Sequence, residues 1–547
     1  MPAELCRTRA RELRASSRFL PLSLVLTSLL LVPAPTPAAP PLGPQPEAPP
    51  RHPEAVVTSD RPTYAPGDVA TVTVTLTGPV PSQGVMQLVL AADSDAAEPP
   101  ILWMETLTLP DEPVDDTYVF HVPLPDVGAY FAGVLVLNAF GRVVETGGVD
   151  LYVNPQLPWV PDDVLTYQAI LVDAALIRAQ ADFAAWSGEP VELVFGPTSF
   201  NVRLQHNGEL LELFEKPDLL PDLALYRGTL AGQPDSSVRL TIVGGDVYAF
   251  VEPSDTLNDG FDAFFVEPSR RFDENRPPIE HIGYFGRHVA VPPLGDDAHG
   301  GPEDGPSPAP PELFGAGDWG GVEPGGKVKP QGFWCPWLLV RCYFDTPPSA
   351  ARSTAIFAYI NYMDDRFSKY AGARVFMGAW TQINTNDYPD VSHPNDWFGL
   401  LGRFRSDFPL FDQWIEVLFT DNPGNINYSV YLGFAGLDRG QFAGAQQAYA
   451  WVRNKHNIST FVVRTTTMHE LSHVLGASDT ASGHRNNHLY KKCKCKVLWW
   501  CLKWQKYYSV MRSSVDPFIV HKWHDADKNT LRATIQGTPG QFGWPCP

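Results

Sequence analysis

The chain has 547 residues, a length that predicts three or four domains rather than one. Hydrophobic residues make up 44% of the sequence and charged residues 19%, a composition that excludes a disordered polyelectrolyte. The formal net charge of -20 argues against general binding of nucleic acid. The 54 prolines and 44 glycines gather between segments, where they indicate linkers and turns.

The first 39 residues have the pattern of an export signal. Arginines between Arg7 and Arg18 precede an apolar run from Phe19 to Val32, and small residues follow around Ala38. The apolar run is short for a membrane span, although a short membrane anchor is the alternative. We therefore expect a signal peptide over residues 1–39, a secreted protein and no stable membrane span.

The next segment predicts a β-sandwich. Residues 40–53 are a proline-rich spacer, and residues 54–154 contain short runs in which polar and apolar residues alternate. Such runs, separated by turn signals, predict several short strands. These strands are expected at residues 69–76, 84–91, 117–122 and 133–138. The opening from Ser59 to Asp68 resembles immunoglobulin-like modules, which implies an immunoglobulin-like scaffold without catalytic residues.

Residues 156–288 are expected to form an α+β domain. A helix is predicted over Asp162–Ala184, followed by strands at residues 200–204, 222–229, 237–242 and 246–251. The runs that begin at Asn207, Tyr226 and Ser236 resemble the propeptide of reprolysin (adamalysin) proteases, which implies a zymogen. This segment has no cysteine to cap a zinc ion, so inhibition would need another ligand or steric blocking. The alternative is an accessory β-rich domain that is never removed.

The remaining residues predict a linker and a third domain. Residues 289–330 are rich in Pro, Gly and Asp and indicate a flexible linker. Cleavage there, or near Arg270–Arg271, would release residues 331–547. In this last domain, helices are expected at residues 348–370, 459–475 and 525–535, and strands at residues 373–383, 414–419 and within 440–452. Alternating strands and helices predict an α/β catalytic domain.

The cysteines agree with export. Cys6 would leave with the signal peptide, and the other six lie in the last domain: Cys335, Cys342, Cys493, Cys495, Cys501 and Cys546. An even set in one exported domain predicts up to three disulfides. The alternative is a second metal site built from Cys493, Cys495 and Cys501.

The residues that carry chemistry lie between Met468 and Asp479, where the sequence reads MHELSHVLGASD. On a helix, His469 and His473 are four residues apart and face the same side, where two neutral imidazoles can bind one zinc ion. Glu470 can act as the general base that takes a proton from zinc-activated water and passes it to the leaving amine. The pattern predicts hydrolysis of peptide bonds in a protein or peptide substrate.

A glycine and an aspartate follow at a fixed spacing. Gly476 tolerates the positive φ with which a helix can end, and Asp479 can offer a third ligand as the chain returns. The spacing HExxHxxGxxD resembles the zinc-binding signature of metzincin proteases, with aspartate in place of the more common third histidine. The resemblance implies a secreted zinc metalloendopeptidase with one catalytic zinc ion on His469, His473 and Asp479.

Two further features refine this site. The run from Tyr508 to Ser514 resembles the Met-turn of metzincins, which implies that Met511 packs beneath the metal without binding it. His484 or His488 is the alternative third ligand if Asp479 only orients another ligand. Residues 414–420 resemble a central strand of reprolysin-like domains. Residues 440–451 take the place of the edge strand on which an extended substrate would pair.

Residues 485–508 are basic and aromatic in an otherwise acidic protein, with seven Lys and Arg residues before Tyr507 and no acid. This segment is either a site for an acidic partner or a disulfide-pinned loop with solvated lysines. The run from Asp525 to Asn529 hints at a calcium loop, but the positions that follow do not fit one, so a helix start is the better interpretation. Structural calcium therefore has no support.

The competing function comes from a different class. The chain could be a secreted binding or adhesion protein, in which the protease domain is a catalytically retired scaffold. The presence of His469, Glu470 and His473 together favours the enzyme. A nucleic-acid binder is disfavoured because no recognised module is present and the net charge has the wrong sign.

Overall fold

The computed structural model describes residues 53–78, 83–92, 100–110, 116–212, 214, 222–254, 262–290, 334–345, 350–386, 388–389, 400, 403–404, 406–407, 414–420, 433–435, 448–475, 477, 490–497, 500–507, 509–511, 523, 525–537 and 543–545. The predicted signal peptide, nearly all of the proline-rich spacer and almost the whole of the predicted linker lie outside these residues. No helix in the described part of the chain is long and apolar enough to cross a membrane. The described residues are mostly β-structure with few helices, arranged in separate sheets.

Residues 54–153 form two sheets around one core. The first has the order β1-β3-β6 and the second the order β2-β8-β7-β4-β5. Their bounds are β1 (Glu54–Ser59), β2 (Thr63–Tyr64), β3 (Val69–Thr77), β4 (Val85–Ala92), β5 (Ile101–Thr108), β6 (Asp116–Pro123), β7 (Gly128–Leu137) and β8 (Val143–Val153). Val72 and Val74 of β3 pack with Leu88 of β4 because alternate side chains of each strand point inward. The predicted β-sandwich is present, and all four predicted strands are confirmed.

The middle domain, residues 156–290, is built on one antiparallel sheet with the order β10-β11-β12-β13-β14-β15-β16-β9. The strands are β9 (Gln168–Leu171), β10 (Val191–Phe195), β11 (Thr198–His206), β12 (Ala224–Leu230), β13 (Gln233–Val243), β14 (Asp246–Glu252), β15 (Phe264–Pro268) and β16 (Glu280–Phe285). Two short 3-10 helices matter below, η1 (Gly208–Leu211) and η3 (Ser269–Arg271). The four strands predicted here are confirmed.

The helix predicted over Asp162–Ala184 is wrong in its first half. Helix α1 covers Ala174–Ser187 and begins after Asp173, whose side chain accepts hydrogen bonds from the first turn. It ends at Gly188, which has the positive φ that glycine tolerates. The residues before it are extended instead, because β9 pairs with β16 and Val164 forms a bridge with Val289. Pairing with a distant strand overrides the helical spacing of apolar residues.

The C-terminal domain, residues 334–545, has a mainly parallel sheet with the order β18-β17-β19-β21-β20. Its strands are β17 (Trp334–Asp345), β18 (Arg374–Ile383), β19 (Trp414–Thr420), β20 (Gly433–Ala435) and β21 (Ala448–Arg453), with β24 (Gly543–Pro545) paired to β17. The helices are α2 (Ala350–Ala371), α4 (Thr460–Val474) and α5 (Asp525–Gly537). Alternating parallel strands and helices confirm the α/β prediction for this domain.

The predicted edge strand is wrong. Residues 440–451 were expected at the edge of the sheet, but β21 is an inner strand, parallel to β19 on one side and antiparallel to β20 on the other. β20 is therefore the edge strand on that side of the described sheet. The error arises because the sequence does not reveal the order of the strands in space. The chain forms β20 at the edge first, and then places β21 between β19 and β20.

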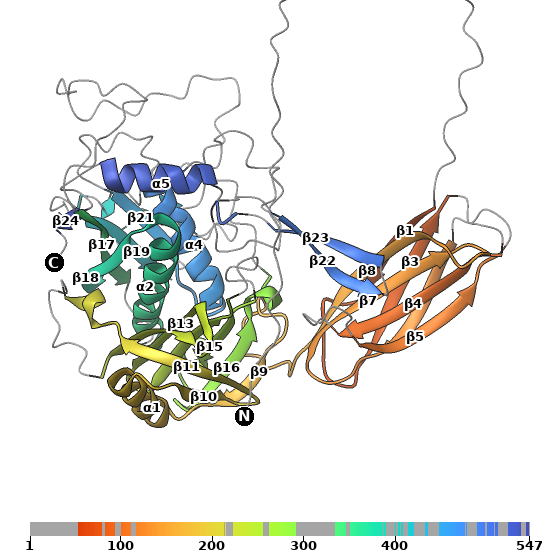
Figure 1. The fold of residues 1–547 in the computed structure, drawn as a ribbon, viewed down its shortest axis with the longest axis horizontal. Helices are drawn as coiled ribbons and strands as arrows, with labels where there is room; N and C mark the ends of the chain where they lie inside the picture. The colour runs from red at the N-terminus through yellow and green to blue at the C-terminus, as the bar shows by residue number, and fades with distance from the viewer. Residues whose placement is uncertain are drawn as a thin grey trace, which may run out of the picture. The chain divides into compact units, whose positions relative to one another are not determined.

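Helices α2 and α4 lie between the two sheets of the middle and C-terminal domains (Figure 1). Nearly every residue of α2 is buried, and every residue of α4 is buried. A single hydrophobic core contains Phe265 of β15, Tyr362 of α2 and Phe461 of α4. The middle domain and the C-terminal domain thus share a core, and α4, which carries the candidate site, crosses it.

Candidate functional site

Tertiary packing makes residues 460–474 helical. Ser459 caps the helix, since its Oγ accepts a hydrogen bond from the Val462 amide at 3.4 Å. Three consecutive threonines, at positions 465 to 467, are weak helix formers. Each is accommodated because its hydroxyl donates to the carbonyl four residues earlier. Burial on all sides then holds this helix in place.

The two predicted histidine ligands are brought together. The Nε2 atoms of His469 and His473 are 3.0 Å apart, and the ring centroids are 4.5 Å apart. The other ring nitrogen of each residue faces a backbone carbonyl: Nδ1 of His469 is 2.8 Å from the Val510 oxygen, and Nδ1 of His473 is 2.8 Å from the Ala477 oxygen. Both rings are almost fully buried.

These contacts assign the tautomers. A carbonyl oxygen only accepts hydrogen bonds, so each Nδ1 must carry the proton and donate it. Each Nε2 then carries a lone pair, the form in which an imidazole can bind a metal ion. The separation of 3.0 Å is close to the roughly 3.3 Å expected between two nitrogens that bind one tetrahedral zinc ion. The spacing of the two nitrogens therefore fits a metal ion, and the two carbonyls fix the orientation of the rings, as is usual for metal-binding histidines.

Glu470 and Met511 are also buried near this helix. Glu470, the predicted general base, is 2% exposed and directly follows His469. Met511, also 2% exposed, is next to Val510, whose carbonyl orients His469 across 41 positions of sequence. The Met511 amide donates to Oγ of Ser509 at 3.2 Å, which forms a tight turn. The segment predicted to lie beneath the metal thus contacts the first histidine.

The third ligand is not placed. Asp479 and its alternatives His484 and His488 lie outside the described residues, as does Gly476. Among the residues that are described, no group of three or more His, Cys, Asp or Glu side chains could hold a metal ion. The structure therefore brings together His469 and His473 of the predicted set, and the third ligand stays a prediction.

Cys342 is the cysteine whose side chain the structure describes. Cys342 is a buried free thiol on β17, and burial raises its pKa well above the usual value. It lies in the hydrophobic core of the C-terminal domain. Disulfides among the other cysteines stay a prediction, because the structure does not describe their side chains. Cys493, Cys495 and Cys501 lie on a hairpin, and the structure does not describe their side chains.

The basic segment folds as a hairpin. β22 (Tyr490–Val497) pairs with β23 (Trp500–Tyr507) in an antiparallel ladder with register shifts near Cys495. An acidic partner for residues 485–508 stays a prediction, because the structure does not describe the side chains of this segment. Asp525 begins α5, which confirms a helix start rather than a calcium loop.

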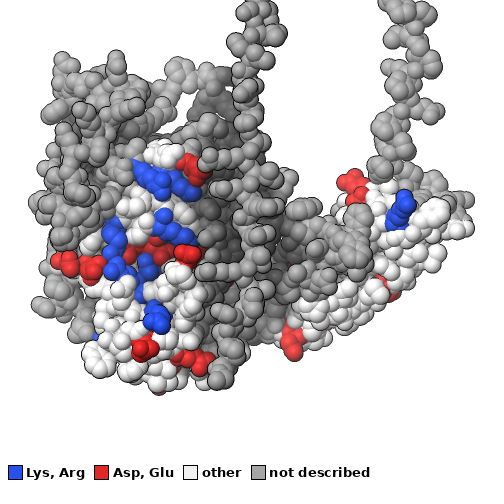
Figure 2. All heavy atoms as spheres, in the orientation of Figure 1, with Lys and Arg blue, Asp and Glu red and all other residues white. Residues whose placement is uncertain are grey.

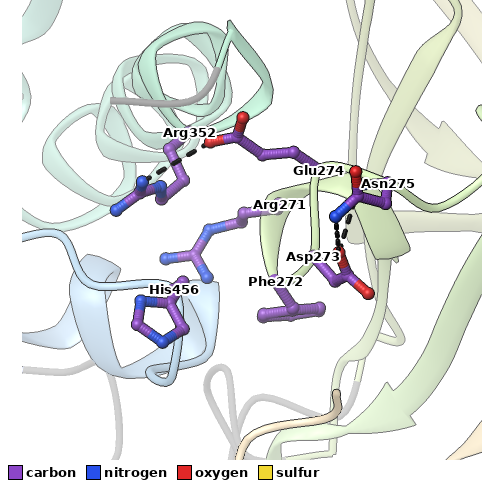
Figure 3. A pocket seen from close by; sticks show the side chains of 7 residues that line it. All are labelled: Arg271, Phe272, Asp273, Glu274, Asn275, Arg352 and His456. Atoms are coloured by element: carbon purple, nitrogen blue, oxygen red, sulfur yellow. Dashed lines mark hydrogen bonds and ion pairs between the residues drawn. The ribbon is translucent and has the colours of Figure 1, made fainter. Parts of the chain in front are cut away.

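A separate pocket lies near the other end of α4 (Figure 3). It has a volume of about 330 Å³ and is lined by Arg271, Phe272, Asp273, Glu274, Asn275, Arg352 and His456. Burial, helped by the neighbouring cations, lowers the pKa of His456. Arg352 lies 3.7 Å from Glu274, so opposite charges already face one another in the pocket. His456 precedes α4, whereas His469 lies ten residues beyond the N-cap Ser459, about 15 Å along the helix axis.

Some site residues carry no signal in the sequence. The carbonyls of Val510 and Ala477 act through the backbone, which any residue type supplies. Trp523 donates from Nε1 to Oγ of Ser472 at 2.8 Å and supports the same stretch of α4. Asp163 and Glu267 hold the first amides of α4 from the middle domain, more than 190 positions away in sequence. A local motif cannot reveal such partners.

Comparisons with known proteins give little. No family and no curated protein matches this chain in sequence. Among solved structures, metalloproteinase-II from Bacteroides fragilis is similar at 12% identity and a TM-score of 0.36, over 65% of this chain and 95% of that one. A superoxide reductase (neelaredoxin) from Ignicoccus hospitalis is similar at 13% identity and a TM-score of 0.15, over 18% of this chain and 80% of that one. Similarity at this level establishes neither a family nor an activity.

Proposed function

We propose that this chain is a zinc-dependent endopeptidase whose centre is formed by His469, Glu470 and His473. One observation carries the proposal: two buried imidazoles on one face of α4 direct unprotonated Nε2 atoms at each other while carbonyls hold both Nδ1 atoms. The spacing and the orientation of the two rings suit a pair of nitrogen donors to one divalent cation.

The residues would divide the work as follows. His469, His473 and Asp479 would hold the ion, and zinc when bound supplies Lewis acidity towards water and the substrate carbonyl. Glu470, nearly excluded from solvent, would accept the proton of the attacking water. The same carboxyl group would then deliver this proton to the departing amine nitrogen. Val510 and Ala477 would keep the imidazoles in the tautomer that accepts the metal.

The finer fold and location belong to the same proposal. The C-terminal domain would be of the metzincin type, with Met511 in the turn beneath the metal, and residues 54–154 would be an immunoglobulin-like module. The parallel strands around β17 and the contact between Val510 and His469 support this assignment. The chain would be exported through its first 39 residues and act on extracellular proteins or peptides.

The test is zinc content and peptidase activity of the full chain beside Glu470→Gln. We expect one zinc ion in both proteins and a loss of about 10²–10⁴-fold in kcat/KM in the variant, the range typical of a lost general base. His473→Ala should lose the metal as well as the activity. Asp407→Asn, at an exposed ion pair with Arg403, is the matched control and should change neither quantity.

The outcomes of this test separate the enzyme from the binding protein. Zinc in both proteins with cleavage by the wild type alone supports the mechanism. Zinc without cleavage in either protein supports a secreted binding protein built on a retired scaffold. A folded chain that binds no zinc overturns the proposal.

A further inference from the structure

The middle domain contributes to the same core as the active-site helix. Phe265 of β15 meets Phe461 of α4 edge to face at 5.4 Å, and Phe250 of β14 meets Tyr362 of α2 at 4.7 Å. The guanidinium group of the buried Arg464, on α4, lies over the Phe265 ring at 5.3 Å. Aromatic rings packed in this way are buried from both domains at once. Removal of either domain would expose them.

Charges are also paired across this boundary. Arg366 of α2 is fully buried and lies 2.6 Å from Glu252 of β14, which is itself 3% exposed. Arg239 of β13 lies 3.1 Å from Asp365 of α2. A buried charge that loses its partner is strongly destabilising. Each domain therefore supplies the counter-charge of the other.

Ion pairs also connect the two domains at the surface. Figure 2 shows Lys and Arg side chains interleaved with Asp and Glu on the face that carries α2 and β18. Arg374 of β18 lies 2.9 Å from Glu209 of η1 and 2.6 Å from Asp364 of α2. Arg227 of β12 lies 3.5 Å from the same Glu209. The ionic chain thus joins both domains at the surface as well as inside.

Two carboxylates of the middle domain cap the active-site helix. Asp163 accepts from the Ser459 amide at 3.0 Å, and Glu267 accepts from the Thr460 amide at 3.0 Å. Both amides lie at the N-terminus of α4, where the first N–H groups have no partner within the helix and the helix dipole favours negative charge. The end of α4 opposite the histidines is therefore held by side chains that belong to another domain.

Arg271 also attaches the middle domain to the C-terminal domain. Its side chain is fully buried and donates to the Tyr359 hydroxyl, the Asn454 side chain and the Ile458 carbonyl. All three partners belong to the C-terminal domain. Burial of Arg271 therefore argues against cleavage of the bond between Arg270 and Arg271 in the folded chain.

From these contacts we infer that the middle domain is a permanent half of the catalytic unit, in which Asp163 and Glu267 are positioning residues for α4, rather than a propeptide that leaves. Its role in catalysis rests on the proposed function, whereas its permanence does not. Cleavage of the connection between Ala290 and Trp334 would leave two chains that remain one folded body.

The first experiment introduces a recognition sequence for a specific protease between Ala290 and Trp334 of the full chain. After cleavage, we expect both fragments to elute together from a sizing column in native buffer and to separate only in denaturant. Separation in native buffer, with the C-terminal fragment still folded, overturns the inference. This readout needs neither zinc nor activity, so its failure is distinct from failure of the proposed function.

The second experiment addresses the positioning role with Glu267→Ala, Glu267→Gln and the exposed control Glu192→Ala. Hydrogen exchange of the first turn of α4 should be roughly tenfold faster in Glu267→Ala, the effect of a lost cap. Glu267→Gln retains an acceptor and should restore most of the protection, and the control should match the wild type. If the enzyme is active, kcat should fall with KM unchanged. Unaltered exchange in Glu267→Ala overturns the role of Glu267.

Discussion

The two β-rich regions of this chain, the N-terminal sandwich and the middle domain, differ in how they relate to the rest of the molecule. In β3 of the N-terminal sandwich, buried and less buried residues alternate, and the inward side chains pack within residues 54–153. In β14 of the middle domain, all seven residues are buried. Val247, Ala249 and Val251 face a core shared with α1, whereas Tyr248 and Phe250 face the core shared with α2 and α4. Because both faces of this sheet are buried, its stability depends on the helices that pack on each face.

The magnitudes show which interaction matters most at this boundary. Fourteen residues of the middle domain belong to the core that they share with α2 and α4. At about 1.5–3 kcal/mol for each fully buried apolar side chain, their burial is worth roughly 20–40 kcal/mol as an upper estimate. A surface ion pair such as Arg374–Glu209 contributes about 1 kcal/mol or less. Apolar burial therefore holds the domains together, and the buried charges fix how they fit.

The largest effect should come from breaking the buried ion pair between the domains. Glu252→Leu removes the carboxylate that pairs with both Arg366 and Lys369 and leaves only Asp365, 2.7 Å away, beside Arg366. We expect a loss of about 3–5 kcal/mol in the free energy of unfolding. Calorimetry of the full chain should show the middle and C-terminal domains melting together at a lower temperature. Asp407→Asn, at an exposed pair, should cost less than about 1 kcal/mol. Separate melting of the two domains would contradict the shared core.

A core substitution in the sandwich should have a more local effect. Leu88 is fully buried among residues of the sandwich alone, so Leu88→Ala should cost about 2–4 kcal/mol in that region. The transition of the middle and C-terminal domains should keep its midpoint. Hydrogen exchange resolved by segment would measure both. Faster exchange in α4 of this variant would show that the sandwich is not independent.

The smallest effect should be a dependence on pH. Burial is the main reason that the pKa of Asp163 is raised to about 7. Hydrogen bonds from Ser459 lower this pKa, and the charge of Glu267 raises it further. A carboxyl group with a raised pKa in the folded state stabilises the fold at low pH, and this contribution is lost as the pH rises through 7. Between pH 5.5 and pH 8 the free energy of unfolding should fall by about 2 kcal/mol from this group.

Asp163→Asn removes the titrating group and keeps an acceptor for the Ser459 amide. Urea unfolding of this variant should show a weaker dependence on pH than the wild type across the same interval. The charge of Arg271 lowers the pKa of Asp163, so both proteins in this comparison must keep Arg271. An identical slope in both proteins would assign the pH dependence to another group.

Local patterns predicted much of the fold. Strand β3 follows from the alternation of its residues, and the helix predicted over residues 459–475 is α4 (Thr460–Val474). The pairing of His469 with His473 follows from a spacing of four on a helix. The prediction of a helix from Asp162 is wrong in its first half because β9 pairs with β16. The prediction of an edge strand within residues 440–451 is wrong because β20 pairs with the outer side of β21. Both errors concern which distant strand lies alongside.

The sequence by itself determined the residue types of the site, since a helical spacing of two histidines and a glutamate needs no distant partner. Only the tertiary structure decided that carbonyls of Val510 and Ala477 select the histidine tautomers, because the backbone groups that do so are the same in every residue. It also decided that Asp163 and Glu267 cap α4. A carboxylate can satisfy a helix terminus from any position in the chain, and folding alone chooses which one does.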